Sequence, residues 1–246
     1  FLLAVSGGID SMVMLDFFNK NSSLANISVC YVDHNYHSDS KKMGKLVSSY
    51  CSDNNIMYIE HSIESSTIKR NIESQLREKR YSCLSEACKE MNADYIVTAH
   101  HSDDQIETIL MKILNSSSFT SMRGIQSLNN NLFRPMLDIT KDEIYKYAKE
   151  NKVEYISDPT NNDTSLTRNF LRKKVIPSLE KIKPNLHKPF EDFQNKTNDM
   201  EDLLAFSTNE FMKSDYVSLS KDVYYINKKR FLDLPFLLKI NIIKKI

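Results

Sequence analysis

Long apolar runs are absent from this sequence. None of its 246 residues belongs to a stretch approaching the roughly 18 consecutive apolar residues that a membrane-spanning helix requires. The apolar start at residues 1–5 is too short for a secretion signal and has no cationic flank. With 41% hydrophobic residues the chain can still bury a substantial core. We therefore expect a globular, cytoplasmic protein with no membrane partner.

Cysteine is scarce, and no two cysteines form a CxxC pair. Cys83 and Cys88 are separated by four residues and have no set of histidine or cysteine partners nearby, which disfavours zinc and iron–sulfur sites. Cys30 and Cys51 lie in strand-like or helical patterns, and a chain of this length does not need disulfides. We predict four reduced, packed cysteines and no structural metal.

The net charge of +1 conceals one basic segment. Between residues 166 and 189 a single acid, Glu180, faces seven cationic residues: Arg168, Arg172, Lys173, Lys174, Lys181, Lys183 and Lys188. Such a patch can neutralise the phosphates of a nucleic acid, but solvated protein faces also carry runs of charge. Charge alone leaves both interpretations open.

Hydrophobic periodicity in the first half alternates between short apolar segments and amphipathic ones. We predict strands at 2–5, 27–32, 57–59 and 95–99, and helices at 10–19, 41–54, 71–91 and 103–114. Repeated βα units imply an α/β fold with a doubly wound, mostly parallel, Rossmann-like sheet. Such sheets bind ligands beyond the carboxyl ends of their strands, so the loops after Val5, Val32 and Ala99 should converge on one crevice.

The alternation changes in the second half of the chain. A short helix is predicted at 140–151, with Thr140 as its cap, and the βα pattern ends beyond about Lys183. Pro184 and Pro189 then flank a connection to a helical stretch at about 190–212. We expect a catalytic domain at 1–185, followed at 186–246 by a linker and a smaller, mostly helical and incomplete region.

The loop after the first expected strand reads SGGIDS. Gly7 and Gly8 allow backbone N–H groups to approach a phosphate, and the following helix points its positive dipole end at the anion. The loop has no GK[ST], and so lacks the lysine with which the P-loop of kinases and GTPases grips phosphates. A glycine turn that merely starts a helix is the alternative to an ATP pyrophosphate cradle. The predicted ATP-binding residues are Ser6, Gly7, Gly8, Ile9, Asp10 and Ser11, with Asp10 also a candidate Mg²⁺ ligand.

Two further loops carry polar side chains at strand ends. His34 follows the strand that ends at Val32, and His100 begins the segment HHSDDQIET at residues 100–108. Within that segment Asp103 and Glu107 stand four residues apart, and Asp104 and Glu107 three, so their carboxylates are expected on one side of a helix near its N-terminus. They suit an ammonium group or a metal ion, although acids in a first helical turn often only complement the helix dipole.

Taken together, these motifs resemble the tRNA(Ile)-lysidine synthetases, a family of PP-loop ATP pyrophosphatases. The resemblance covers at least residues 2–179. It rests on SGGIDS, VDH at 32–34, NIE at 71–73, LREKRY at 76–81, TAHHSDDQIET at 98–108, RGI at 123–125, RP at 134–135, DPTNND at 158–163 and RNFLR at 168–172. The first motif belongs to many PP-loop enzymes, whereas the ordered combination is far narrower.

The resemblance implies a two-step reaction that uses ATP and Mg²⁺. ATP adenylates the C2 oxygen of the wobble cytidine of a tRNA(Ile) with a CAU anticodon and releases pyrophosphate. The ε-amine of free L-lysine then displaces AMP and leaves lysidine. A homodimer is compatible with this interpretation.

The resemblance also implies roles for residues around the nucleotide. Val32, His34 and His100 are expected near the ATP. Arg77 and Arg80 are expected to meet phosphate or the target base. Guanidinium groups suit this role because they bind phosphate oxygens in pairs.

A second group of residues is expected to bind the lysine. Asp103, Asp104 and Glu107 would receive its ammonium group or Mg²⁺, and Arg168 and Arg172 would complete the pocket or meet tRNA. Because the amine must attack as a neutral base, we predict Asp104 or Glu107 as the proton acceptor. The predicted catalytic residues are Asp10, Arg77, Asp104 and Glu107.

The sequence departs from the family pattern at three places. Tyr31 stands where relatives usually have His, His37 where they usually have Arg, and residues 115–118 (NSSS) replace an RGxG stretch. The last change puts RNA contacts of that loop in doubt but not the adenylation centre.

Three other functions share part of this pattern. A sulfur-inserting PP-loop enzyme would be expected to carry cysteines near the site, commonly as CxxC. An amidating ligase would have no reason to carry the DPTNND and RNFLR segments. A non-catalytic nucleotide- or RNA-binding module would lose acids and arginines that are present here.

Overall fold

The structure, a computed structural model, describes residues 1–23, 25–33, 39–63, 72–157 and 163–246. The chain forms two compact units: residues 1–111 with 125–187, and residues 112–124 with 188–246. The segment 112–124 therefore belongs with the C-terminal part of the chain, which no sequence pattern indicated. The predicted division between residues 185 and 186 stays a prediction.

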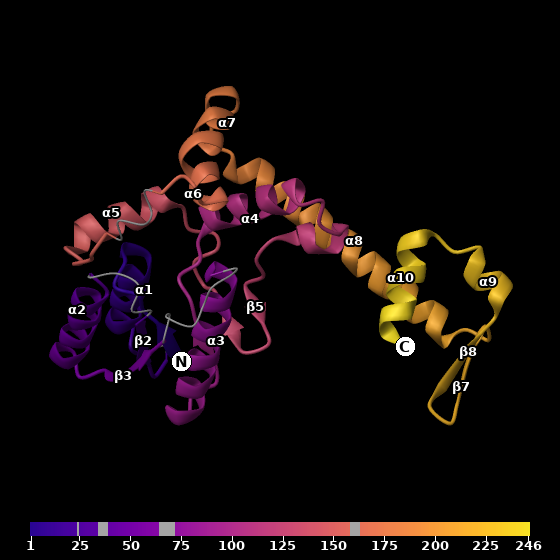
Figure 1. The fold of residues 1–246 in the computed structure, drawn as a ribbon, viewed down its shortest axis with the longest axis horizontal. Helices are drawn as coiled ribbons and strands as arrows, with labels where there is room; N and C mark the ends of the chain where they lie inside the picture. Colours follow the sequence, from indigo (N-terminus) through magenta and orange to yellow (C-terminus); the bar gives the residue numbers. More distant parts are fainter. Residues whose placement is uncertain (24, 34–38, 64–71, 158–162) are drawn as a thin grey trace. The chain divides into compact units, whose positions relative to one another are not determined.

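A six-stranded sheet organises the first unit (Figure 1). Its order is β3-β2-β1-β4-β6-β5, and every neighbouring pair is parallel except β5 with β6. The predicted doubly wound, mostly parallel sheet is thus confirmed, and the antiparallel edge is an addition. The strands are β1 (Leu2–Ala4), β2 (Ser28–Asp33), β3 (Met57–Ser62), β4 (Ile96–Val97), β5 (Leu128–Asn129) and β6 (Leu132–Phe133).

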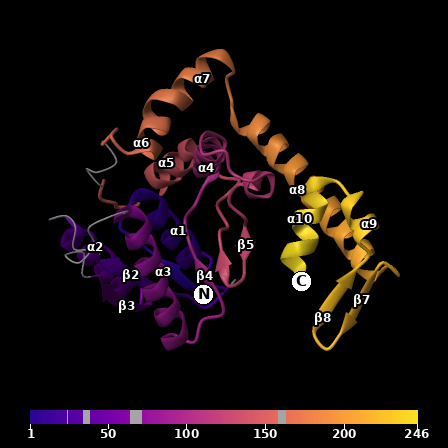
Figure 2. The same cartoon turned by 45° about the vertical axis from the view of Figure 1, so that its right-hand side comes forward.

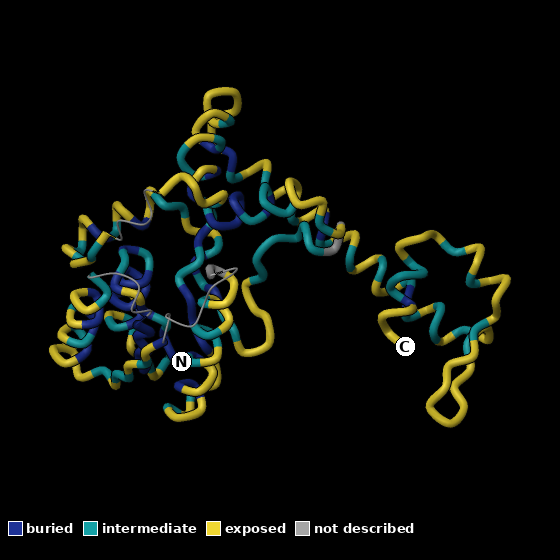
Figure 3. The backbone as a smooth tube through the Cα atoms, in the orientation of Figure 1, coloured by how far each residue is buried: buried dark blue, intermediate teal, exposed yellow. Residues whose placement is uncertain are grey.

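Helices cover both faces of this sheet because successive side chains of a strand point to opposite sides. Leu3 and Val29 pack into one core cluster, to which α1, α2 and α5 contribute. Leu2 and Cys30 pack into a second cluster, to which α3 contributes. The buried strands are dark blue in Figure 3. The helices are α1 (Ile9–Lys20), α2 (Ser40–Asp53), α3 (Ile72–Glu90), α4 (Ser102–Leu114) and α5 (Lys141–Asn151).

Most predicted elements are present with shifted ends. β3 continues past the predicted end at Ile59 to Ser62, whereas β4 is confined to Ile96–Val97. The predicted cap of α5 is confirmed as a capping box, in which the Thr140 hydroxyl accepts from the Glu143 N–H and the Glu143 carboxylate accepts from the Thr140 N–H.

A helical run with an irregular middle follows in the first unit. It consists of α6 (Thr167–Phe170), a π-helical turn η4 (Leu171–Val175) and α7 (Ile176–Ile182). Single π-turns inside helices are frequent at functional sites. Of the two arginines of the RNFLR segment, Arg168 lies in α6 before this turn and Arg172 lies within the turn.

The second unit is mostly helical, as predicted. It also contains a β-hairpin, which the sequence pattern did not predict (Figure 2). The hairpin turns at Lys221 and Asp222, whose φ angles are 50° and 61°, as a two-residue type I′ turn requires. The elements of the second unit are η2 (Phe119–Arg123), α8 (His187–Lys213), β7 (Val217–Ser220), β8 (Val223–Ile226), α9 (Lys228–Leu232) and α10 (Phe236–Lys245). Within the described ranges no helix is long and apolar enough to cross a bilayer.

Candidate active site

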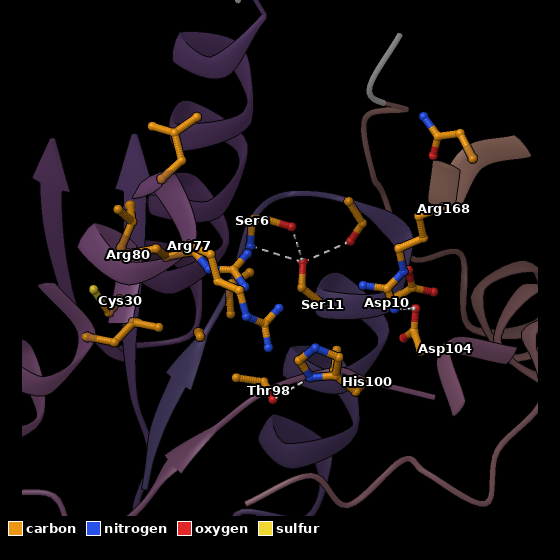
Figure 4. A pocket seen from close by; sticks show the side chains of 18 of the residues that line it. Ser6, Asp10, Ser11, Cys30, Arg77, Arg80, Thr98, His100, Asp104 and Arg168 are labelled. Atoms are coloured by element: carbon orange, nitrogen blue, oxygen red, sulfur yellow. Dashed lines mark hydrogen bonds and ion pairs between the residues drawn. The ribbon is translucent and has the colours of Figure 1, made fainter. Parts of the chain in front are cut away.

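A cavity of about 540 Å³ lies in the first unit, where β1 and β4 end (Figure 4). Its volume falls in the range of small-molecule sites. The carboxyl ends of neighbouring parallel strands meet here, as the βα pattern predicted. The cavity is lined by Ala4, Val5, Ser6, Gly8, Asp10, Ser11, Cys30, Val32, Leu76, Arg77, Arg80, Leu84, Thr98, Ala99, His100, Asp104, Leu166, Arg168 and Asn169.

The SGGIDS loop is folded tightly around its glycines. Gly7 has a φ of +81°, and a Cβ atom there would lie 2.9 Å from the Cβ of Met43, so both backbone and packing require glycine. Gly8 is extended and precedes α1, and its carbonyl accepts from the N–H of Met12 at 3.0 Å. The start of α1 therefore faces the cavity with the positive end of its dipole.

Two hydroxyl groups brace this loop. The Ser6 N–H donates to Ser11 Oγ at 3.1 Å, and the two hydroxyl oxygens lie 3.2 Å apart. Ser11 Oγ also donates to the Gly8 carbonyl at 3.0 Å. Figure 4 shows the side chains of Ser6 and Ser11 directed toward each other and joined by these contacts. These hydrogen bonds hold the loop in shape, and both serines line the cavity.

Asp10 lies on the cavity wall and is bound by a lysine from a distant helix. Lys141 Nζ, in the first turn of α5, lies 2.5 Å from Asp10 Oδ1. Lys141 stands 131 residues further along the chain than Asp10. Nothing in the pattern around Lys141 indicated this contact, because only the tertiary fold brings α5 beside α1.

His101 is buried between three carboxylates. Its Nε2 lies 3.7 Å from Asp10 Oδ1 and 3.6 Å from Asp104 Oδ2, and its Nδ1 lies 3.4 Å from Asp103 Oδ2. Burial lowers the pKa of His101, but the three acids outweigh it and the net pKa is raised. The imidazole thus links Asp10 in the loop to the acids at the start of α4.

Asp104 and Glu107 are held by two arginines. Arg168 donates to Glu107 Oε2 at 2.6 Å and to Asp104 Oδ1 at 3.0 Å. Arg172 donates to Glu107 Oε1 at 2.5 Å and to Oε2 at 3.0 Å. Burial raises the pKa of Asp104, yet His101 and Arg168 outweigh burial and hold that pKa below its usual value. Glu107 has no exposed side-chain surface, so its charge is compensated entirely inside the protein.

Two arginines of α3 line the other side of the cavity. In Figure 4, Arg77 and Arg80 lie across the cavity from Asp10, Asp104 and Arg168. Their guanidinium carbons lie 5.2 and 5.4 Å from the centroid of the Tyr81 ring, within cation–π range. Burial, together with nearby Arg77, lowers the pKa of Arg80 below its usual value, although its neighbour Tyr81 acts in the opposite direction. This wall is suited to an anionic ligand.

His100 faces the cavity as a neutral imidazole. Its Nδ1 lies 2.9 Å from the Thr98 hydroxyl. Burial lowers its pKa to about 3, and Arg134 acts in the same direction against the opposing effect of Asp104. At neutral pH His100 can therefore donate or accept a hydrogen bond without adding charge.

The predicted site residues are only partly brought together. Those that line the cavity are Ser6, Gly8, Asp10, Ser11, Val32, Arg77, Arg80, His100, Asp104 and Arg168. Those that do not are Gly7, Ile9, Asp103, Glu107 and Arg172, while His34 lies outside the described residues. The three acids are also divided: Asp103 accepts from the N–H of Lys141, whereas Asp104 and Glu107 bind arginines.

Several residues of the site carry no distinctive sequence signal of their own. Thr98 lies in the TAHHSDDQIET motif and Asn169 in RNFLR, so these motifs already indicate that both residues are near the site. Cys30 and Leu166 lie on the wall without any pattern that distinguishes them from core residues. The four cysteines are free, and Cys30 is buried with a pKa raised to about 12 by burial and by nearby Cys83.

Known proteins of one kind are similar in sequence to most of this chain. A tRNA(Ile)-lysidine synthase of Bacillus subtilis is 32% identical over 244 residues, covering 95% of this chain and 52% of the relative. The enzyme of the same name from Thermosipho africanus is 32% identical over 235 residues, covering 92% and 55%. The chain thus spans about half the length of these relatives.

A solved structure shows the fold of this chain, and a family model shows its family. The structure of a U34-tRNA thiolase, NcsA from Methanococcus maripaludis, matches with a TM-score of 0.66 at 17% identity, covering 80% of this chain and 72% of that one, which shows a shared fold. The family described as a PP-loop domain matches residues 1–179, which contain the SGGIDS loop and every described residue of the cavity wall. This chain belongs to the PP-loop domain family.

Proposed function

We propose that the protein is a tRNA(Ile)-lysidine synthetase acting in the cytoplasm on the wobble cytidine of a CAU-anticodon tRNA(Ile). The observation that carries the proposal is the similarity, over most of this chain, to relatives that bear that name. The cavity supports it, because an anion cradle, a cationic wall and a carboxylate converge there.

In the first step the SGGIDS loop holds the triphosphate of ATP. Backbone N–H groups at Gly8 and the start of α1 bind the departing pyrophosphate, and Ser6 adds a hydroxyl donor. Ser11, whose hydroxyl donates to the Gly8 carbonyl, holds the loop in shape. The C2 oxygen of cytidine attacks the α-phosphorus, and the bond to the pyrophosphate breaks. Arg77, on the opposite wall, stabilises the charge that develops on the α-phosphate.

Mg²⁺ fits this site as an ion shared with the substrate. Among the described residues no group of three or more histidines, cysteines or acids is arranged to hold a metal. Mg²⁺ needs only one or two carboxylates when phosphates and water complete its shell. Asp10 would supply that carboxylate, and the ion would neutralise charge on the leaving pyrophosphate.

In the second step the lysine amine attacks C2 of the adenylated cytidine and AMP leaves. Asp104 is the candidate for binding the ammonium group, because it reaches the cavity whereas Glu107 is enclosed by Arg168 and Arg172. The lowered pKa of Asp104 favours a charged carboxylate at neutral pH, as cation binding requires. Between the two predicted bases, the geometry favours Asp104 for the proton of the amine and leaves Glu107 to position the arginines.

The test is incubation of the protein with labelled lysine, ATP and a CAU-anticodon tRNA(Ile), followed by nucleoside analysis. The proposal expects ATP-dependent incorporation that appears as lysidine at the wobble position. A transcript with uridine at that position serves as the control and should remain unlabelled. Lysine found in the tRNA without a modified cytidine would overturn the proposal.

Sulfur insertion, the main alternative, receives no support from the cysteines. Persulfide chemistry needs a thiolate. Cys30, the cysteine on the cavity wall, has a pKa raised to about 12 and is therefore a thiol at neutral pH. The likeness to the thiolase structure concerns the fold alone.

A further inference from the structure

The contact between Lys141 and Asp10 has no role in the reaction described so far. Both side chains are partly buried, with 27% and 32% of their surfaces exposed, so the pair is more than a solvated surface contact. Lys141 Nζ also lies 5.3 Å from the ring centroid of Tyr145, one turn further along α5. The ammonium group thus has two partners, one of which lines the cavity.

The backbone of Lys141 is fixed independently of its side chain. Its N–H donates to Asp103 Oδ2 at 2.9 Å, and the capping box of Thr140 and Glu143 sets the start of α5. Asp103 in turn lies 3.4 Å from His101. The position from which the lysine reaches Asp10 is therefore set by α4 and by the first turn of α5, not by a flexible loop.

A lysine beside this loop can offset the repulsion between the Asp10 carboxylate and the triphosphate of ATP. ATP brings several negative charges to a loop whose own acid, Asp10, lies on the same cavity wall. An uncompensated carboxylate there would repel the triphosphate. A lysine within the loop would solve the problem, but this loop has none.

We propose that Lys141 is a positioning residue that acts through Asp10: it neutralises and orients this carboxylate so that the SGGIDS loop accepts the triphosphate when Mg²⁺ is scarce. Mg²⁺ and Lys141 are then alternative partners of the same carboxylate. The inference rests on the proposed use of ATP. It assigns no direct phosphate contact to Lys141.

The inference predicts a distinctive dependence on Mg²⁺. In Lys141→Met, Asp10 loses its nearer cation and keeps only His101, whose Nε2 lies 3.7 Å away. ATP binding should therefore weaken about ten-fold in EDTA, the effect of losing one partly buried charge pair. Saturating Mg²⁺ should restore most of the affinity, because the ion neutralises Asp10 instead. Lys141→Arg, which keeps the charge, should bind ATP nearly as well as the wild type in both conditions.

The measurement is calorimetric titration of the full chain with the non-hydrolysable analogue α,β-methylene-ATP, in EDTA and in Mg²⁺. Lys146→Met, on the exposed side of the same helix, is the matched control and should bind like the wild type. Thermal unfolding checks that each variant is folded. If Lys141→Met is unfolded, Lys141→Gln, which retains a donor without the charge, takes its place.

A double-mutant cycle with Asp10→Asn decides the route of action. If Lys141 acts through Asp10, adding Lys141→Met to Asp10→Asn should change ATP affinity less than two-fold, since no carboxylate is left to neutralise. Equal losses in both backgrounds and at both Mg²⁺ levels would overturn the inference and indicate direct phosphate contact. Lys141→Met indistinguishable from Lys146→Met would also overturn it. If the wild type itself does not bind the analogue, the proposed ATP chemistry fails first.

Discussion

Arg172 Nε lies 2.5 Å from Glu107 Oε1, and this carboxylate has no exposed surface. Arg168 holds the other oxygen of Glu107 and also reaches Asp104, which lines the cavity. Glu107 therefore connects the RNFLR segment to α4. Removing its charge should disturb both the fold and the cavity wall.

We expect Glu107→Gln to lower the free energy of unfolding by about 2 kcal/mol. A fully buried pair broken on one side costs about 3–5 kcal/mol, and the partial exposure of both arginines reduces that figure. Lysidine formation should fall at least ten-fold, because Arg168 loses the shorter of its two contacts with carboxylates. Urea unfolding and the labelled-lysine assay measure the two effects. An unchanged unfolding midpoint together with full turnover would show that the carboxylate serves neither purpose.

The two glycines of the loop should respond differently to alanine. Gly7→Ala places a side chain at a φ of +81° and 2.9 Å from Met43 Cβ, so we expect a loss of about 1–3 kcal/mol in unfolding free energy. At Gly8 the nearest atom to a new Cβ is Ser6 Oγ at 3.6 Å, an ordinary contact. Gly8→Ala should therefore fold normally but bind ATP more weakly, because the methyl group would occupy space that a phosphate needs.

Chemical denaturation and ATP titration of both glycine variants test this contrast. Gly8→Ala is the folded control for the stability effect at Gly7. A Gly7→Ala protein as stable as the wild type would mean that the loop relaxes away from Met43. A Gly8→Ala protein with unchanged ATP affinity would remove Gly8 from the phosphate cradle.

Stability should depend on pH through His100. Its pKa is lowered from 6.5 to about 3, so below pH 6.5 the unfolded chain binds a proton that the folded chain refuses. The stabilisation associated with the neutral imidazole is present above the unfolded pKa and is lost as pH falls toward 3. In His100→Gln, the loss of stability between about pH 7 and pH 5 should be smaller than in the wild type by about 1–2 kcal/mol. Urea unfolding at a series of pH values gives both slopes, and parallel slopes would contradict the assignment.

Tyr81 offers a test of the arginine wall. Its ring lies within cation–π range of both Arg77 and Arg80, so Tyr81→Leu should release them and weaken ATP binding several-fold. Tyr81→Phe keeps the ring and should bind like the wild type. Calorimetric titration of both variants is the measurement, and equal affinities for Leu and Phe would show that the arginines are held by other contacts.

The sequence was informative where local patterns decide structure. Buried strands such as β2 and the SGGIDS loop were readable because apolar runs and glycine pairs act locally. The pairing of Lys141 with Asp10 was not, since it joins residues 131 positions apart. The enclosure of Glu107 was also hidden, because spacing along α4 shows which acids share a face but not which cations meet them.

The hairpin β7–β8 was also not predicted from the sequence, although part of its pattern is local. β7 alternates apolar and polar residues, whereas β8 is Val-Tyr-Tyr-Ile and does not. Lys221 and Asp222 at the turn are not the Asn-Gly or Asp-Gly pair that usually signals a type I′ turn. Both residues adopt positive φ angles, which Asp adopts more readily than most residues but Lys does not, so the pair gives only half of the local signal.

The proposed adenylation can be followed through one oxygen atom. If ATP activates the C2 oxygen of the wobble cytidine, that oxygen leaves with AMP when the lysine amine attacks. A tRNA(Ile) carrying ¹⁸O at C2 of this cytidine, incubated with the protein, ATP and lysine, should release AMP that contains the label, as read by mass spectrometry. Unlabelled AMP with ¹⁸O retained in the RNA would contradict the account.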